Sequence, residues 1–148
     1  MSGVRLRRAD WAHDAAALSQ VRRAVFIDEQ GVPEALEWDA ADAAALHWLA
    51  FAADGTPVGC ARLLADGHLG RMAVLPGWRG RGIGAALLAA ALDSARARGH
   101  VRVCLSAQLH AAGFYARAGF VAEGAVYQEA GIPHVAMCMR FEPSKISG

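Results

Sequence analysis

The chain has 148 residues, which is the size of one globular domain, and we expect a single domain over residues 1–148. Hydrophobic residues make up 55% of the chain and charged residues 20%, which is enough apolar material for a core and too little charge for disorder. The formal net charge of +1 lacks the basic excess with which nucleic-acid-binding proteins neutralise phosphates, so we expect no nucleic-acid partner.

The sequence also predicts the compartment. No apolar run approaches the roughly 20 residues that a helix needs to cross a bilayer, and the first eight residues are polar, so we expect a cytoplasmic protein with no membrane partner. Three cysteines, Cys60, Cys104 and Cys138, are odd in number and far apart, and each lies in an alternating apolar run. We therefore expect buried free thiols.

In the first half of the chain the pattern predicts one edge strand, one helix and a three-stranded meander. Asp10 can cap a helix over residues 11–26, and a polar acidic connection follows from residue 28 to residue 42. The pairs Asp54-Gly55 and Asp66-Gly67 are typical of tight turns between antiparallel strands. The strands predicted here cover residues 4–8, 47–53, 57–64 and 68–74.

The second half predicts helices and strands in alternation. A helix over residues 83–98 ends at Gly99 and joins strand 68–74 to strand 101–107, so these two strands should run parallel with a right-handed crossover. The remaining elements are a short helix over 111–118 and strands over 120–127 and 134–141. The predicted fold class is α+β, with a mixed, mostly antiparallel sheet and helices packed on it.

The most informative segment is a glycine-rich loop between strand 68–74 and helix 83–98. Gly80, Gly82 and Gly84 alternate in it. Without Cβ atoms they allow the backbone to bring successive N–H groups close to a ligand at the start of a helix, where the helix dipole favours anions. The pattern predicts a phosphate-binding loop.

Three kinds of phosphate loop share such glycines. A Walker A loop needs Lys and Ser or Thr after its last glycine, where this chain has Ile83 and Gly84, so an NTPase is excluded. A dinucleotide site needs an acidic residue after the next strand, which instead ends in Gln108, so a nicotinamide cofactor is disfavoured. The third kind, the coenzyme A loop Arg/Gln-x-x-Gly-x-Gly/Ala, matches residues 79–84 at every defined position.

With this loop, the chain resembles the GNAT acetyltransferase superfamily. Residues 71–84 resemble the family's motif A, and residues 107–120, which close with Tyr115 and Gly119-Phe120, resemble motif B. The chain resembles one bacterial subgroup, called ElaA-like or YjcF-like, more fully, and this resemblance covers nearly the whole chain. One departure from the wider superfamily is His110, where many members have Asn. The subgroup signature lies in residues 25–33, in Glu37, Asp39, Asp42 and His47, and in residues 129–135.

The resemblance implies a single-domain GNAT fold whose sheet splays between the strands that end at Val74 and Ala107, with helices on both faces. It implies direct transfer of an acetyl group from acetyl-CoA to a primary amine of a small molecule or peptide, and it makes a homodimer a family-level expectation. The pantetheine arm would pair with the first of these strands and the pyrophosphate would meet the glycine loop. The implied cofactor contacts are Met72, Ala73, Val74, Arg79, Gly80, Arg81, Gly82, Ile83, Gly84, Ala85, His110, Phe114 and Tyr115.

Five residues are candidates for proton transfer. The family motif places a tyrosine like Tyr115 beside the cofactor sulfur, where it would act as a general acid, although a core tyrosine would fit the pattern too. Glu29 and Glu37 lie in the acidic connection that forms one wall of the acceptor site in GNAT folds, and a solvated loop is the competing interpretation. Glu129 and His134 would form the opposite wall. One of these four would accept the amine's proton, unless bulk solvent does.

Two further function classes are weighed against this one. A non-catalytic acyl-CoA-binding module would keep the cofactor cleft without an acceptor. A metal enzyme would need ligand spacing that the six histidines do not show, so we expect no metal.

Overall fold

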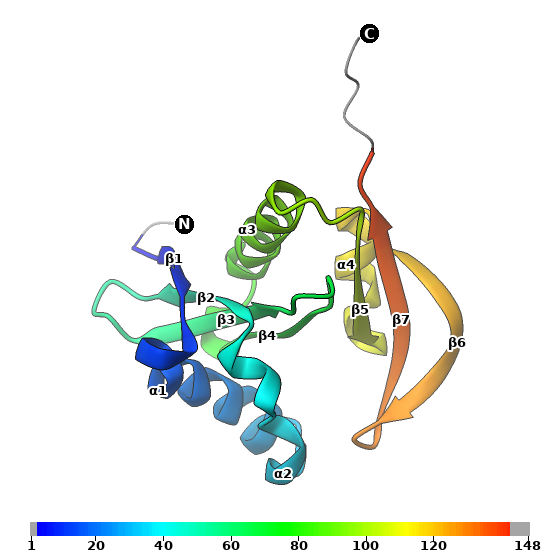
Figure 1. Cartoon of the computed structure of the whole chain (residues 1–148). Coiled ribbons are helices and arrows are strands. Elements are labelled where there is room, and N and C mark those ends of the chain that lie inside the picture. Colours follow the sequence, from blue (N-terminus) through cyan, green and yellow to red (C-terminus); the bar gives the residue numbers. More distant parts are fainter. Residues whose placement is uncertain (1–2, 143–148) are drawn as a thin grey trace, which may run out of the picture.

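The computed structural model describes residues 3–142, and its strands form two groups that lie side by side (Figure 1). The first four strands form an antiparallel sheet in chain order, and the last three form a second sheet in the order β5-β7-β6. The strands are β1 (Arg5–Ala9), β2 (Leu46–Phe51), β3 (Pro57–Leu63), β4 (Leu69–Val74), β5 (Arg102–Gln108), β6 (Val121–Glu129) and β7 (Ile132–Arg140).

The two sheets meet along β4 and β5. Within residues 3–142 these parallel strands are joined by one isolated bridge, between His68 and Cys104. Because the bridge lies at the start of β4, the two strands separate toward their carboxyl ends at Val74 and Gln108. The predicted splayed α+β sheet is therefore confirmed, and the splay exposes the inner edges of both strands.

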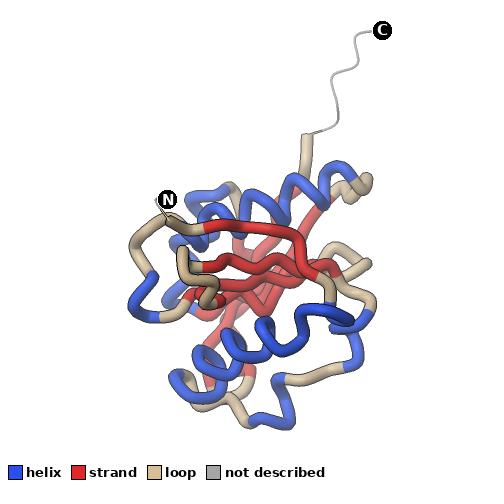
Figure 2. Tube along the Cα trace, turned by 90° about the vertical axis from the view of Figure 1, so that its left-hand side faces the viewer, coloured by secondary structure: helices blue, strands red, loops and turns tan. Residues whose placement is uncertain are grey.

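Helices cover both faces of the first sheet (Figure 2). Helix α1 (Trp11–Arg22) packs on one face and α3 (Ile83–Ala97) on the other. Asp10 caps α1 by accepting a hydrogen bond from the His13 amide at 2.9 Å, as the sequence predicts. The helix does not end near residue 26, because a wider π-helical segment continues it over Arg23–Glu29. The short helix α4 (Ala112–Ala118) packs against β5.

The acidic connection is folded more tightly than a solvated loop. It contains the one-turn helix α2 (Glu34–Glu37) and a 3₁₀ turn over Ala40–Ala43. Arg22, which is 1% exposed, donates to Glu37 Oε2 at 2.7 Å and to Asp42 Oδ1 at 2.8 Å. Burial raises the pKa of Glu37. Burial also acts on Asp42, but hydrogen bonds from arginines outweigh it and lower the pKa of that carboxyl.

This buried ion pair gives a stability prediction. We expect Glu37→Gln to lower the free energy of unfolding by about 2 kcal/mol, since a charge-assisted hydrogen bond becomes a neutral one in a buried site. The matched control is Glu34→Gln, whose carboxylate forms an exposed pair with Arg23 and should cost less than about 0.5 kcal/mol. Urea denaturation measures both. Equal midpoints for the two variants would contradict a stabilising role for the buried pair.

The cysteines differ from expectation. Cys104 and Cys138 lie directly opposite each other in the antiparallel pair of β5 and β7, and they form a disulfide. The prediction of three free thiols is therefore wrong for these two, because it considered sequence spacing and not the register of β5 on β7. Cys60 is free and buried, as predicted, and burial raises its pKa to about 12.

Candidate active site

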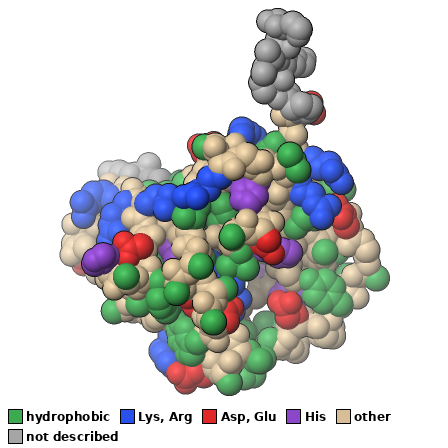
Figure 3. Space-filling view, in the orientation of Figure 1, with side chains coloured by type: hydrophobic (Ala, Val, Ile, Leu, Met, Phe, Trp, Pro, Cys, Tyr) green, Lys and Arg blue, Asp and Glu red, His purple; other side chains and the backbone are tan. Residues whose placement is uncertain are grey.

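A cleft of about 940 Å³ opens where β4 and β5 separate. Its walls come from β4, β5, the π-helical segment, α2 and the tip of the β6–β7 hairpin, and Figure 3 shows the surface hollowed between the two halves of the molecule. The strand divergence thus creates a cavity between the two sheets. Of the residues predicted for the site, those that line it are Glu29, Glu37, Met72, Ala73, Val74, Arg79, His110, Tyr115, Glu129 and His134.

The inner edge of β4 carries a bulge that the sequence analysis did not predict. Cys60 pairs with Ala73 and Arg62 with Gly70, so β4 holds one residue more than β3 between these pairs. Arg71 occupies the bulge with φ of 46°, a left-handed conformation that is strained for a residue with a side chain. The bulge thus lies within the stretch of β4 that lines the cleft.

The glycine loop lies beside the cleft, at the amino end of α3. Gly80 and Gly82 have φ of 78° and 82°, and a Cβ at either position would meet nothing within 4 Å. Glycine is therefore favoured at both positions by the positive φ and not by a lack of space, and the region around both residues is open. Gly82 is the N-cap of α3 and offers no side-chain acceptor, which leaves the N–H groups of the first turn available to an anion.

Gly84 has a different part in the structure. A Cβ at this position would lie 3.6 Å from the ring of Phe114 on α4. Gly84 thus allows the close approach of the Phe114 ring, whereas Gly80 and Gly82 shape the loop itself. The predicted contacts Gly80, Arg81, Gly82, Ile83, Gly84, Ala85 and Phe114 lie outside the lining of the cleft described above.

Arg79 and Glu29 form a pair at the edge of the cleft. The guanidinium of Arg79 donates to both carboxylate oxygens of Glu29, at 2.7 and 2.8 Å, and through Nε to the carbonyl of Val74 at 2.9 Å. The hydrogen bond from Arg79 lowers the pKa of Glu29. The pair makes Glu29 a weaker base than an unpaired glutamate, and it ties the π-helical segment to the end of β4.

Tyr115 reaches the cleft from α4. Its ring makes edge contacts with Phe114 and Phe120, at centroid distances of 5.1 and 5.8 Å, which hold it in place. Burial raises the pKa of its hydroxyl to about 12, so the group is protonated at neutral pH. Among the described residues no side chain or carbonyl hydrogen-bonds to this hydroxyl, which leaves it free to donate to a ligand.

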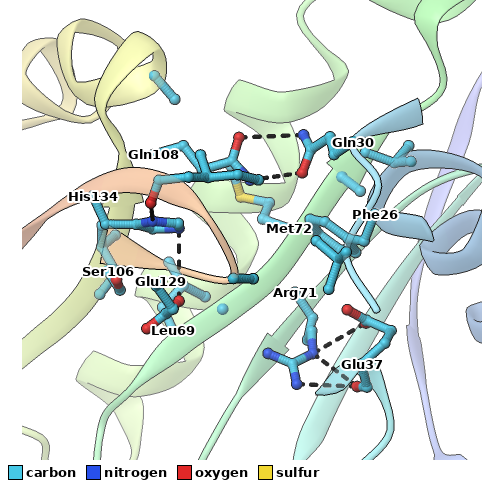
Figure 4. Close-up of a pocket in the computed structure, with 18 of the residues that line it drawn as sticks. Phe26, Gln30, Glu37, Leu69, Arg71, Met72, Ser106, Gln108, Glu129 and His134 are labelled. Carbon is cyan, nitrogen blue, oxygen red and sulfur yellow. Dashed lines mark hydrogen bonds and ion pairs between the residues drawn. The ribbon is translucent and has the colours of Figure 1, made fainter. Parts of the chain in front are cut away.

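His134 and Glu129 lie together on the hairpin wall (Figure 4). His134 is 5% exposed, and its Nδ1 lies 2.7 Å from the carbonyl of Ile132, an arrangement that makes Nδ1 the donor. In the neutral imidazole the lone pair is therefore on Nε2, which lies 3.6 Å from Glu129 Oε2. The ring of Tyr127 stacks on the imidazole and supports its orientation.

Sequence reasoning missed one pair across the cleft. The side-chain amides of Gln30 and Gln108 exchange two hydrogen bonds, at 2.7 and 3.2 Å, from the end of the π-helical segment to the end of β5 (Figure 4). Both side chains line the cleft. No local signal pairs two glutamines that are 78 positions apart.

Comparisons with known proteins agree with this geometry. The family model described as "Acetyltransferase (GNAT) domain" matches residues 13–141. The uncharacterized N-acetyltransferase YjcF of Bacillus subtilis is 35% identical over 79% of this chain and 86% of its own. An acyl-CoA N-acyltransferase from Pseudomonas aeruginosa is 34% identical, with a TM-score of 0.81 over 92% of this chain and 99% of its own. Escherichia coli ElaA is 29% identical, with a TM-score of 0.82 over 93% and 99%.

The chain therefore belongs to the GNAT acetyltransferase family. Its similarity to ElaA and YjcF confirms the resemblance to that bacterial subgroup, and the family and the neighbouring acyl-CoA N-acyltransferase identify it as an enzyme of acyl transfer. In the part of the chain that the structure describes, no helix is both long and apolar enough to cross a membrane.

Proposed function

We propose that the protein transfers an acetyl group from acetyl-CoA directly to a primary amine of a small molecule or peptide. The observation that carries this proposal is the continuity of the site: the cleft between β4 and β5 is lined from Arg79, which precedes the glycines of the loop, past Tyr115, to His134. An extended pantetheine arm matches the free edge of β4 at Met72–Val74, because its amides can pair with an unpaired strand edge. The pyrophosphate matches the N–H groups that follow Gly82.

The proposed chemistry assigns one proton transfer to each wall. His134 accepts a proton from the acceptor ammonium through Nε2, and the neutral amine attacks the thioester carbonyl. The N–C bond forms, and a backbone N–H at the β4 bulge stabilises the oxyanion. When the C–S bond breaks, Tyr115 donates its proton to the departing thiolate, and the attacking nitrogen releases its second proton to solvent to give the neutral amide. The tyrosinate then regains a proton from solvent. Glu29, Glu37 and Glu129 stay alternative bases, of which Glu29 and Glu37 are held by arginines.

The base assignment gives a kinetic prediction. We expect His134→Gln to lower kcat/KM by about 10²-fold, because the glutamine amide keeps a polar side chain but cannot accept the amine's proton. The loss should be largest on the acidic side of the pH–rate profile. Glu129→Gln is the matched control, and it should change the rate only a few-fold if Glu129 merely faces the imidazole. An unchanged profile for the His134 variant would remove His134 as the base, and unchanged profiles for variants at all four candidate positions would assign the proton to bulk solvent.

A thiol-release assay tests the proposal as a whole. Acetyl-CoA is offered with a panel of primary amines, and amine-dependent release of coenzyme A supports transfer. Tight binding of coenzyme A with no turnover on any amine would favour the alternative, a non-catalytic acyl-CoA-binding module. We also propose a cytoplasmic location and a homodimer.

A further inference from the structure

The acidic connection does not present free carboxylates to an acceptor. From the sequence, Glu29 and Glu37 are candidate acceptors of the amine's proton. Instead, five of its six carboxylates are paired with four arginines, and the sixth, Asp28, does not line the cleft. The pairs are Glu29 with Arg79, Glu34 with Arg23, Glu37 with Arg22, Asp39 with Arg62, and Asp42 with both Arg22 and Arg62.

Arg71 is the charged group that this side of the cleft presents. It lines the cleft from the β4 bulge, and its side chain is 25% exposed. Its Nε lies 3.1 Å from Glu37 Oε2, and its Nη2 donates to the Glu37 carbonyl at 3.0 Å and to Asp39 at 3.3 Å. Among residues 3–142, no acceptor hydrogen-bonds to Nη1. In Figure 4 that nitrogen points away from Glu37 and into the cleft.

The surroundings hold this guanidinium in place. The carboxylates that contact Arg71 are also neutralised by other arginines, since Glu37 binds Arg22 and Asp39 binds Arg62. The three arginines Arg22, Arg62 and Arg71 therefore balance the three acids Glu37, Asp39 and Asp42. Arg71 supplies the charge that brings this cluster to neutrality. An incoming anion meets a fixed guanidinium whose Nη1 still has free N–H donors, a geometry that suits a carboxylate.

The opposite wall of the cleft, formed by the β6–β7 hairpin, suits a cation. It presents the lone pair of His134 Nε2 and the carboxylate of Glu129, whose side chain is 58% exposed. This wall suits an ammonium group that is about to lose a proton. The cleft thus offers an anion contact at the β4 bulge and an amine contact at the hairpin.

We propose that the acceptor is a small aminocarboxylate such as a free amino acid, whose carboxylate binds Arg71 while its amine faces His134 and Glu129. This inference rests on the proposed acetyl transfer and specifies its acceptor. The reaction is unchanged: the amine nitrogen forms a bond to the acetyl carbon, and coenzyme A leaves as the thiol. The carboxylate is not altered and serves only to orient the amine.

The test uses matched acceptors that differ only in the carboxylate. Thiol release from acetyl-CoA is measured with the common amino acids, with their α-carboxamides and with the corresponding decarboxylated amines, and with β-alanine against propylamine. We expect kcat/KM for the best amino acid to exceed that for its amide and for its decarboxylated amine by at least about 10-fold. The reason is that the Arg71 guanidinium is left without a charged partner when either of the other two acceptors is bound. Equal rates, or a preference for the neutral or purely cationic partner, would overturn the inference.

A variant assigns the preference to Arg71. Arg71→Gln should bring the acid-to-amide ratio of kcat/KM close to 1, whereas a general disturbance of the fold would lower both rates by the same factor and leave the ratio unchanged. Arg23→Gln is the matched control, since Arg23 forms an exposed pair with Glu34 and does not line the cleft. An unchanged ratio in the Arg71 variant overturns the assignment. Failure of the underlying proposal is a different result, namely no transfer to any acceptor of either kind.

Discussion

Replacing Gly82 with Asp should lower the affinity for acetyl-CoA by about 10³-fold, because a carboxylate about 4 Å from the pyrophosphate repels it by about 4 kcal/mol at an effective dielectric constant near 20. The new side chain would extend into open space, since a Cβ at Gly82 meets nothing within 4 Å. The fold should therefore survive. Isothermal titration calorimetry with coenzyme A measures the loss.

The matched control separates charge from backbone strain. Gly82 has φ of 82°, where any side chain is strained, but Asp and Asn both tolerate this region better than other residues and have nearly the same shape. Gly82→Asn should consequently retain most of the affinity that Gly82→Asp loses. If both variants bound coenzyme A within a few-fold of the original protein, the pyrophosphate would not lie at this loop.

The parts of the site that could be predicted from the sequence are those whose chemistry is local. The alternating glycines before α3 dictate a tight loop at a helix start whichever sheet the helix packs on. The placement of that helix between two strand-forming segments also determines that β4 and β5 run parallel. The splay followed from the family resemblance, and the separation of the strands after the His68–Cys104 bridge confirms it.

The parts that could not be predicted depend on contacts between distant residues. Glu37 and Asp42 look like surface acids until α1 brings Arg22 between them. Cys104 and Cys138 look like separate core thiols until the register of β5 on β7 places them opposite each other. The bulge at Arg71 arises because β4 is one residue longer than its partner there, a difference that no local pattern in β4 reveals. Each outcome depends on tertiary register, which sequence periodicity does not determine.

The same distinction applies to Tyr115, whose position follows from the motif but whose protonation depends on the fold. We expect Tyr115→Phe to lower kcat by about 10²-fold or more while the affinity for acetyl-CoA hardly changes, because the variant loses only the proton donor to the leaving thiolate. Burial raises the pKa of the hydroxyl to about 12, so the tyrosine stays protonated across the range in which such enzymes are assayed. The loss should therefore be the same at pH 7 as at pH 9.

The stability of this variant provides the control. The Tyr115 hydroxyl makes no hydrogen bond to the described residues, and a phenylalanine ring would keep the contacts with Phe114 and Phe120. The melting temperature of the variant should therefore be unchanged or slightly higher. A fall in kcat without a fall in melting temperature would then be a loss of chemistry. A single-turnover measurement must show that transfer, and not product release, limits the rate. If the variant then kept half or more of the original kcat on a good acceptor, the proton on the leaving sulfur would have to come from another donor.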